Sequence, residues 1–151
     1  MKLNCEKGFT LVELVIGMSI VVILSSVAMF SFSSVERRQL HLAATELKLN
    51  LRKAQSMAMH ESTNYSIVFL VQENSYVMRR MENGRHVSIK QVHFENVTLN
   101  NTTAVGSIVS FTPRGTTGSA STITLQNNSY SVNLTISLGA GRILIHDIIP
   151  K

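Results

Sequence analysis

The 151-residue chain lacks several of the residues on which catalysis and disulfide stabilisation depend. It has no tryptophan, two prolines and one cysteine, Cys5, so that a disulfide within the chain is excluded. Its only aspartate is Asp147, four residues from the end, which excludes chemistry on paired aspartates. If the first eight residues are removed, no thiol nucleophile is left either. These absences favour a structural or binding protein over an enzyme.

Patterns for metal binding and for catalysis are also missing. The five histidines are spread out, and no two of them have the spacing of three or four residues that builds a metal site on a helix. No serine lies in a Gly-x-Ser-x-Gly motif, and the segment 139–141 (Gly-Ala-Gly) lies between two expected strands rather than before a helix. We therefore expect no catalytic residues, no metal and no cofactor, and expect His41, His60, His86, His93 and His146 to lie on the surface or to have their hydrogen bonds satisfied within the fold.

Charge is nearly absent from the segment Phe9–Phe32, where Glu13 is the only ionisable side chain. A helix of these 24 residues would be about 36 Å long, which is enough to cross the hydrocarbon core of a bilayer, about 30 Å thick. The pattern predicts a single transmembrane helix over residues 9–34. A lone charge inside such a helix costs about 2.5–3.5 kcal/mol, so Glu13 is a candidate functional residue.

The order of segments before this helix is the reverse of that in a secretory signal, in which small residues follow the apolar run. Here the short polar segment Met1–Gly8 comes first, and a cut after Gly8 would leave the apolar helix on the mature chain. The new α-amino group of Phe9 would then be a cation at the right depth to pair with Glu13 of a neighbouring, axially shifted subunit. Such a pair would set the stagger between the helices.

The segment Gly8-Phe9-Thr10-Leu11-Val12-Glu13-Leu14 resembles the type III prepilin signal of type IV pilins and type II secretion pseudopilins. The resemblance implies that a membrane prepilin peptidase removes residues 1–8 and N-methylates Phe9. It also implies that Glu13 sets subunit registry in a helical filament. The alternative is an ordinary signal anchor in which the glutamate occurs by chance.

A second helical pattern follows over Val35–His60, and no proline interrupts the chain between Phe9 and His60. We therefore expect one long helix, whose second half packs on a globular domain. Apolar residues recur at alternating spacings of four and three, which marks one face of an amphipathic helix. This expected core face comprises Leu40, Ala44, Leu47, Leu51, Ala54 and Ala58.

Beyond Glu61 the apolar pattern has the period of two that is typical of strands. Asn83-Gly84 predicts a tight hairpin, and the first three runs should form a meander. Residues 96–103 are expected to form a loop with at most a short strand at Val97–Leu99. The fold class is α+β: a long N-terminal helix with small antiparallel sheets packed on its C-terminal half, in a globular domain over residues 35–151. The expected strands are Tyr65–Val71, Ser75–Met81, Val87–Phe94, Ile108–Thr112, Ile123–Leu125, Tyr130–Ile136 and Arg142–Ile149.

Motifs beyond the N-terminal segment narrow the resemblance to H-type pseudopilins and FimT-like minor pilins: the helix pattern Leu51–Ala58 and the segments Phe111–Gly115, Ile123–Leu125 and Gly141–Ile143. In that family a basic C-terminal loop has been linked with DNA capture. This makes Arg114 and Arg142 candidates for contact with nucleic acid. Some members carry a second arginine two residues after the Gly-Arg pair, whereas this chain has Leu144, which weakens the DNA interpretation.

The combined expectation is a minor pilin or pseudopilin, a structural subunit that joins or primes a type II secretion pseudopilus or a type IV pilus. Its expected partners are the prepilin peptidase, other pilin or pseudopilin subunits and the inner-membrane assembly platform. The expected location is the inner membrane, crossed once, with the globular domain periplasmic or extracellular. The alternative is a competence-type minor pilin that captures DNA or another exported substrate. A net charge of +5 permits a DNA partner without demanding one.

Overall fold

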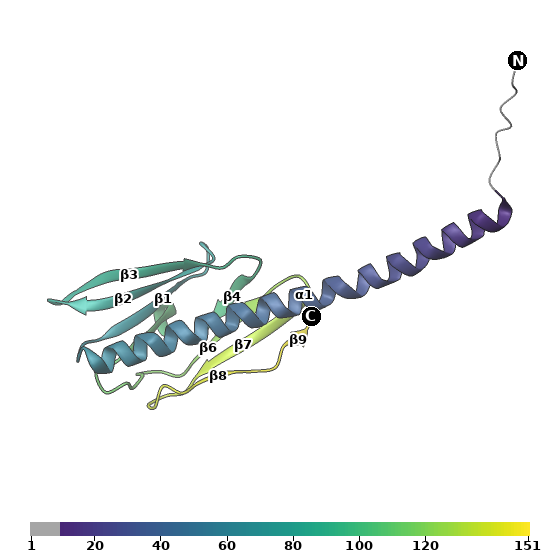
Figure 1. The fold of residues 1–151 in the computed structure, drawn as a ribbon. Helices are drawn as coiled ribbons and strands as arrows, with labels where there is room; N and C mark the ends of the chain where they lie inside the picture. Colours follow the sequence, from purple (N-terminus) through teal and green to yellow (C-terminus); the bar gives the residue numbers. More distant parts are fainter. Residues whose placement is uncertain (1–9) are drawn as a thin grey trace, which may run out of the picture. The chain divides into compact units, whose positions relative to one another are not determined.

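The structure, a computed structural model, describes residues 10–151, with the side chains of all of them except residues 27–34. The chain divides into two compact units, residues 1–35 and 36–151. The helix α1, Leu11–His60, contributes to both units (Figure 1). The α+β class expected from the sequence is confirmed, because all further regular structure in the described residues is antiparallel sheet and one short 3-10 turn, η1, Val105–Ser107.

The expected core face of the helix is confirmed in every position. Leu40, Ala44, Leu47, Leu51, Ala54 and Ala58 each have an exposed fraction of 0 %. One polar residue, Asn50, lies beside this stripe, and its Nδ2 donates a hydrogen bond of 2.7 Å to the buried Tyr76 hydroxyl. This bond ties the helix to the sheet, because breaking it would leave a buried polar group without a partner. Burial raises the pKa of the Tyr76 hydroxyl, so this buried group stays neutral while its oxygen accepts the bond from Asn50.

The first sheet contains four antiparallel strands in the order β3-β2-β1-β5. The expected meander of β1, β2 and β3 is confirmed. The Asn83-Gly84 hairpin is confirmed as well, since Glu82 pairs with Arg85 and both turn residues have positive φ, 50° and 77°. The strands are β1, Tyr65–Leu70; β2, Ser75–Glu82; β3, Arg85–His93; and β5, Ile108–Phe111.

The second sheet has the order β4-β6-β7-β8, and the short strand β9 also pairs with β7. Its strands alternate buried and half-buried residues, with Ile123, Leu125, Val132, Leu134 and Ile136 in the interior. One face of this sheet is therefore covered and the other is turned towards solvent. The strands are β4, Thr98–Thr102; β6, Ser121–Gln126; β7, Tyr130–Ile136; β8, Ile143–Ile145; and β9, Ile149–Pro150.

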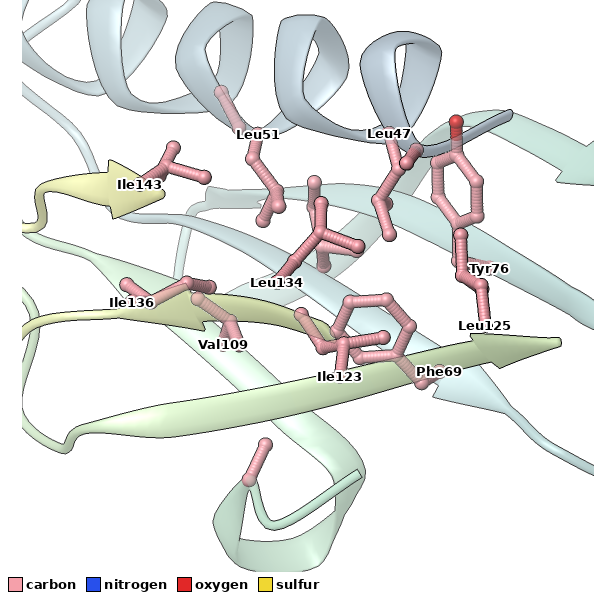
Figure 2. Packing of buried hydrophobic residues seen from close by; sticks show 14 of the residues in the cluster. Leu47, Leu51, Phe69, Tyr76, Val109, Ile123, Leu125, Leu134, Ile136 and Ile143 are labelled. Carbon is pink, nitrogen blue, oxygen red and sulfur yellow. The ribbon is translucent and has the colours of Figure 1, made fainter. Parts of the chain in front are cut away.

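One hydrophobic core joins the helix and both sheets. Figure 2 shows Leu47 and Leu51 pointing from the helix towards the strands that carry Leu134 and Tyr76. Phe69 from the first sheet and Ile123 from the second belong to the same cluster, so neither sheet has a core of its own. The packing holds the turns between strands in fixed positions around the helix.

Two strand predictions were wrong. The segment 96–103 contains a full strand, β4, because Leu99 is buried and holds this polar, Asn-rich segment against β6. The expected strand Arg142–Ile149 is divided into β8 and β9. Leu134 pairs with Ile145 but Ser131 pairs with Ile149, so one extra residue lies on the C-terminal side and interrupts the ladder as a bulge does.

Candidate functional site

The structure describes one of the three residues expected at the N-terminal site. Gly8 and Phe9 lie outside the described residues, whereas Glu13 lies in the first turn of α1. The backbone N–H of Glu13 donates to Thr10 Oγ1 at 3.3 Å, so the Thr10 hydroxyl caps the helix. The spacing Thr10-x-x-Glu13 is that of a capping box, a signal that was present in the sequence and that our sequence analysis missed.

The first turns of α1 expose a continuous apolar surface on all sides of the helix. The exposed fractions of its large side chains run from 52 % for Val15 and Ile20 to 80 % for Leu11. A helix that is apolar all round is expected to be buried, in lipid or among other helices. In the part of the chain that the structure describes, no helix is both long enough and apolar enough to span a membrane. We call the exposed apolar residues of these first turns the apolar helix surface; it comprises Leu11, Val12, Leu14, Val15, Ile16, Met18, Ile20, Val21, Val22, Ile23 and Leu24.

Serine hydroxyls within this segment bond to the helix itself. Ser19 Oγ donates to the Val15 carbonyl at 2.8 Å, and Ser25 Oγ donates to the Val21 carbonyl at 2.7 Å. Ser26 Oγ donates to the Ile23 carbonyl at 2.7 Å. Such bonds are available to serine only inside a helix, and they leave none of these three hydroxyl donors in need of water. The polar residues of the segment are therefore compatible with apolar surroundings.

The two candidate arginines lie on turns that Gln55 of α1 holds together. Gln55 Nε2 donates to the Gly115 carbonyl at 2.7 Å and to the Ala140 carbonyl at 3.2 Å. Arg114 and Arg142 each neighbour one of the bonded turns, and both are exposed. The structure thus brings two segments far apart in the sequence to the end of the helix. Sequence reasoning missed Gln55, because a half-buried glutamine beside a helix stripe carries no distinctive signal.

Glycine is required where these turns meet. Gly141 has a φ of +59°, and a Cβ on it would lie 2.8 Å from Gln55 Nε2 and 3.2 Å from the Gly115 carbonyl oxygen. Gly115 has a φ of +75°, and its Cβ would lie 2.6 Å from Met59 Sδ. A side chain at position 141 would press on the Gly115 backbone and on Gln55, whereas at position 115 the flexible Met59 side chain, exposed to 49 %, can move aside and the positive φ is what favours glycine. The close packing and the positive φ therefore explain the glycine at position 141, whether or not Arg142 contacts DNA.

A charged cluster at the C-terminal end of α1 joins the helix to the first sheet. Arg80 contacts Glu61 at 3.3 Å and Glu82 at 2.7 Å, and the Tyr65 hydroxyl donates to Glu61 at 2.6 Å. The bond from Tyr65, followed by the contact with Arg80, holds the pKa of the Glu61 carboxyl below its usual range. Burial and the neighbouring Glu61 carboxylate raise the pKa of the Tyr65 hydroxyl. The hydrogen bonds of Arg80 to Glu82 and to Glu61 raise the pKa of the guanidinium. Each of the three pKa shifts favours the protonation state that makes these bonds: Glu61 stays deprotonated, and Tyr65 and Arg80 stay protonated.

We expect the Glu61→Gln substitution to lower the thermal midpoint at pH 7 by a few degrees, and its effect to shrink in acid. Because the pKa of Glu61 is lower in the folded state, its stabilising effect is present above the ordinary glutamate pKa and is lost as pH falls through the folded value. Thermal unfolding followed by circular dichroism between pH 7 and pH 3 measures this. Glu73→Gln, in the exposed β1–β2 turn, is the matched control. Equal midpoints for wild type and Glu61→Gln at pH 7 would contradict the prediction.

The described residues contain no group of three histidine, cysteine, aspartate or glutamate side chains able to hold a metal ion. All five histidines are exposed, as expected, and His146 Nε2 lies 2.9 Å from Thr135 Oγ1. No site with the geometry of a catalytic centre stands out from residues 10–151. The features that call for explanation are the apolar helix surface and the two turns around Gln55.

Two family models match the sequence: one for the prokaryotic N-terminal methylation motif over residues 3–29, and one for Type II transport protein GspH over residues 43–141. The fold is similar to that of the type IV minor pilin FimU of Pseudomonas aeruginosa PAO1. One crystal form gives a TM-score of 0.61 at 24 % identity, covering 74 % of this chain and 91 % of that chain. A second crystal form of the same minor pilin gives a TM-score of 0.59 at 23 % identity, and the alignment covers 72 % of this chain and 93 % of that chain.

The fold is also similar to that of EpsH, the minor pseudopilin of the Type 2 Secretion System of Vibrio cholerae. The TM-score is 0.60 at 9 % identity, and the alignment covers 72 % of this chain and 96 % of that chain. At these identities the three structures show the fold alone. No match was found among curated protein sequences. This chain also carries an N-terminal methylation motif and has the fold of a minor pilin and a minor pseudopilin. Because the GspH model matches more than half of the chain, the chain belongs to the family of Type II transport protein GspH.

Proposed function

We propose that the chain is a structural subunit that joins or primes a type II secretion pseudopilus or a type IV pilus through its N-terminal helix. The observation that carries this proposal is the apolar helix surface, which surrounds the first turns of α1 and has one charged residue, Glu13, in its midst. Such a surface needs an apolar environment, and a bundle of equivalent helices supplies one. The N-terminal methylation motif over residues 3–29 supports the same conclusion.

The proposed maturation divides the chain into three parts. Residues 1–8 are a leader that the prepilin peptidase removes, residues 9–34 are the transmembrane and assembly helix, and residues 35–151 are the exported globular domain. Before assembly the subunit crosses the inner membrane once, with the globular domain periplasmic or extracellular. Its partners are the peptidase, other pilin or pseudopilin subunits and the inner-membrane assembly platform.

In this proposal, assembly depends on the ion pair between Glu13 and the N-methylated α-amino group of Phe9 in a neighbouring subunit. Apolar packing supplies most of the cohesion, because a buried ion pair roughly offsets its own desolvation cost. The pair mainly selects one axial stagger, since any other stagger leaves two charges unpaired in apolar surroundings. The chain itself has no catalytic role, and its chemistry is limited to being a substrate of the peptidase.

The intact mass of the membrane-extracted chain tests the proposal. In cells with the prepilin peptidase, we expect loss of residues 1–8 and gain of one methyl group; in cells without it, we expect the full-length mass. Gly8→Leu should block processing. Gly17→Leu is the matched control, because a Cβ at Gly17 meets no atom within 4 Å, and it should be processed normally. An unprocessed mass in both strains would reduce residues 9–34 to a plain anchor.

A second candidate function, capture of DNA, is favoured by the way Gln55 holds the turns next to Arg114 and Arg142. Replacing both arginines with alanine should weaken duplex binding and lower the slope of log affinity against log salt by about 0.9 for each phosphate that is no longer neutralised. Fluorescence anisotropy with a labelled duplex at several salt concentrations measures both quantities. Arg52→Ala, also exposed, is the single-charge control. Absence of binding at low salt would remove this candidate.

A further inference from the structure

The first sheet has a second face, opposite the one that closes the core. Tyr65 and Ile67 of β1 belong to the core shared with α1, so Ser66, which lies between them, points the other way. We call the side of the sheet that carries Ser66 the outer face. Arg79 of β2 lies on the outer face as well, because it is the register partner of Ser66. This face therefore carries a charged residue in the middle of the sheet.

Four polar side chains form one row across the outer face, which we call the polar row. Arg79 is the register partner of Ser66 in β1 and of Ser88 in β3. Ser66 is in turn the partner of Ser110 in β5. Directly opposite residues have Cβ atoms about 4.5–5.5 Å apart, so the long side chain of Arg79 can reach the hydroxyls on both sides of it. A bulge lies at the same row, because β3 has an extra residue, Ile89, at this point. Bulges re-aim side chains and are frequent next to functional sites.

Arg79 makes no ion pair within residues 10–151, although it is half-buried. The next residue, Arg80, lies on the opposite face and contacts two glutamates. In the registers of β1, β2, β3 and β5, no acidic residue shares the outer face, where the only other titratable side chains are His86 and His93. A cation that is partly withdrawn from water without an anion favours binding of an anion from outside the chain.

A cavity of about 250 Å³ opens beside the polar row, and Ser66, Ser110, Met81 and His86 are among the residues that line it. Ser66 is the partner of Arg79 across the strands, and Met81 lies two residues after Arg79 on the same strand, so the cavity borders the arginine on two sides. Ser66 is 5 % exposed, and its hydroxyl makes no hydrogen bond to another residue that the structure describes. Buried hydroxyl groups normally have a partner, so this one is available to a ligand in the cavity.

The charge and the surroundings of the polar row restrict the kind of anion. One arginine balances one negative charge, and its planar fork matches the two oxygens of a carboxylate. A dianionic phosphate would bring a second charge, for which the outer face has no lysine or second arginine. Both sides of the row are apolar: Val68 pairs with Val77 and Ile108 on one side, and Met81 lies on the other. The cavity is smaller than the pockets of about 300–1,000 Å³ that hold drug-sized ligands, so it suits a short group.

We propose that the outer face of the first sheet binds a carboxylate that is carried on a short apolar group. The Arg79 guanidinium donates to both carboxylate oxygens, the Ser66 hydroxyl donates to one of them, and the apolar group occupies the cavity against Met81. The carboxylate belongs either to a free short-chain acid or to the C-terminus of another protein, because the two present the same chemistry to the site.

This inference goes beyond filament assembly through the N-terminal helix. Every residue that it uses lies in the unit formed by residues 36–151, and neither Glu13 nor the apolar helix surface takes part. It also uses neither Arg114 nor Arg142. A chain that fails to assemble can still bind the carboxylate, and a chain that fails to bind the carboxylate can still assemble. The two proposals are therefore tested separately.

Titration of the full chain in detergent micelles with isovalerate, followed by heteronuclear NMR, tests the inference. We expect saturable shifts of the backbone amides of Ser66 and Ser110. The neutral analogue isovaleramide should bind about tenfold more weakly, because it lacks the charge that Arg79 pairs with. Arg79→Gln should weaken isovalerate binding about tenfold or more. Arg85→Gln is the matched control and should bind like wild type, because Arg85 pairs in register with Glu82 on the opposite face.

Two further measurements complete the test. Ser66→Ala, which removes one hydroxyl and little volume, should weaken binding of isovalerate severalfold, and it keeps the inference testable if Arg79→Gln does not fold. A short peptide that ends in leucine with a free carboxylate is compared with the same peptide amidated at its C-terminus. Binding of the free peptide at least as tight as that of isovalerate assigns the site to a protein C-terminus, whereas binding of isovalerate alone assigns it to a free short-chain acid.

Three results would overturn the inference. The first is the absence of saturable shifts with both isovalerate and the free peptide. The second is equal binding of the carboxylate and its neutral amide, or equal binding of isovalerate by wild type and by folded Arg79→Gln. The third is binding of inorganic phosphate at Ser66 and Ser110 that is tighter than binding of isovalerate, which would make the polar row a general anion site.

Discussion

Replacing Glu13 with alanine is expected to lower the amount of the chain in sheared filaments by on the order of a hundredfold. In the proposed bundle, the substitution leaves the α-amino group of Phe9 in a neighbouring subunit without its anion. Removing one partner of a buried ion pair costs about 3–5 kcal/mol, and each 1.4 kcal/mol is about a factor of ten in an equilibrium constant. Quantitative immunoblotting of filament and membrane fractions measures the effect.

Insertion into the membrane should be unimpaired in Glu13→Ala, because the substitution removes a charge that costs about 2.5–3.5 kcal/mol in lipid. Glu13→Gln, which keeps the shape of the side chain, should assemble as poorly as Glu13→Ala. Val12→Ala, which trims an apolar neighbour and keeps the charge of Glu13, should assemble much better than Glu13→Ala. The intact mass must show that the leader has been removed from each variant. Wild-type assembly by processed Glu13→Ala would show that Glu13 does not set registry.

Gly141→Ala is expected to be the most damaging single-methyl substitution in the globular domain. Its φ of +59° is strained for any residue with a Cβ, at about 1–3 kcal/mol. The added carbon would lie 2.8 Å from Gln55 Nε2, 3.2 Å from the Gly115 carbonyl oxygen and 3.3 Å from Thr117 Cγ2, and such overpacking costs about 1–3 kcal/mol more. The free energy of unfolding of a small domain is only about 5–15 kcal/mol, so Gly141→Ala should lower the urea midpoint clearly.

The Gly139→Ala substitution distinguishes the effect of backbone strain from the effect of overpacking. Gly139 has a φ of +78°, yet a Cβ on it meets no atom within 4 Å, so this variant has the backbone strain without the close approach. We expect Gly139→Ala to fall between wild type and Gly141→Ala in free energy of unfolding. Equal losses of stability for the two variants would mean that backbone strain alone explains the glycine at 141. An unaltered midpoint for Gly141→Ala would contradict the described meeting of the two turns.

The local patterns of this chain were sufficient to predict its long helix and most of its strands. Six apolar residues at the period of an α-helix identified the buried face of α1, because burial on one side of a helix forces that period. Asn83 and Gly84 identified the β2–β3 hairpin, because a two-residue turn needs positive φ at both positions. Both predictions were possible because the signal lies in residues that are close together in the sequence.

The order of the strands and the contacts between distant segments could not be predicted in this way. Leu99 is one apolar residue in an Asn-rich segment, and only its packing against β6 makes a strand of β4. Gln55 meets carbonyls 60 and 85 residues away, and Arg80 reaches Glu61 across 19 residues. Such pairs are determined by the tertiary structure and leave no periodic trace. The residues of the N-terminal site, in contrast, were predicted from one short linear motif, and the roles of Gly8, Phe9 and Glu13 stay predictions.

The hydrogen bonds of Ser19, Ser25 and Ser26 to their own helix have a consequence for energetics. A segment whose hydroxyl donors are already occupied neither gains nor loses hydrogen bonds when it passes from one non-aqueous solvent to another. For these three hydroxyls, lipid and a bundle of protein helices are then nearly equivalent media, so that in the proposed assembly the charge of Glu13 and the closeness of side-chain packing distinguish the two. In the proposed transfer from lipid to filament, the three serines would therefore contribute neither a gain nor a cost in hydrogen bonding.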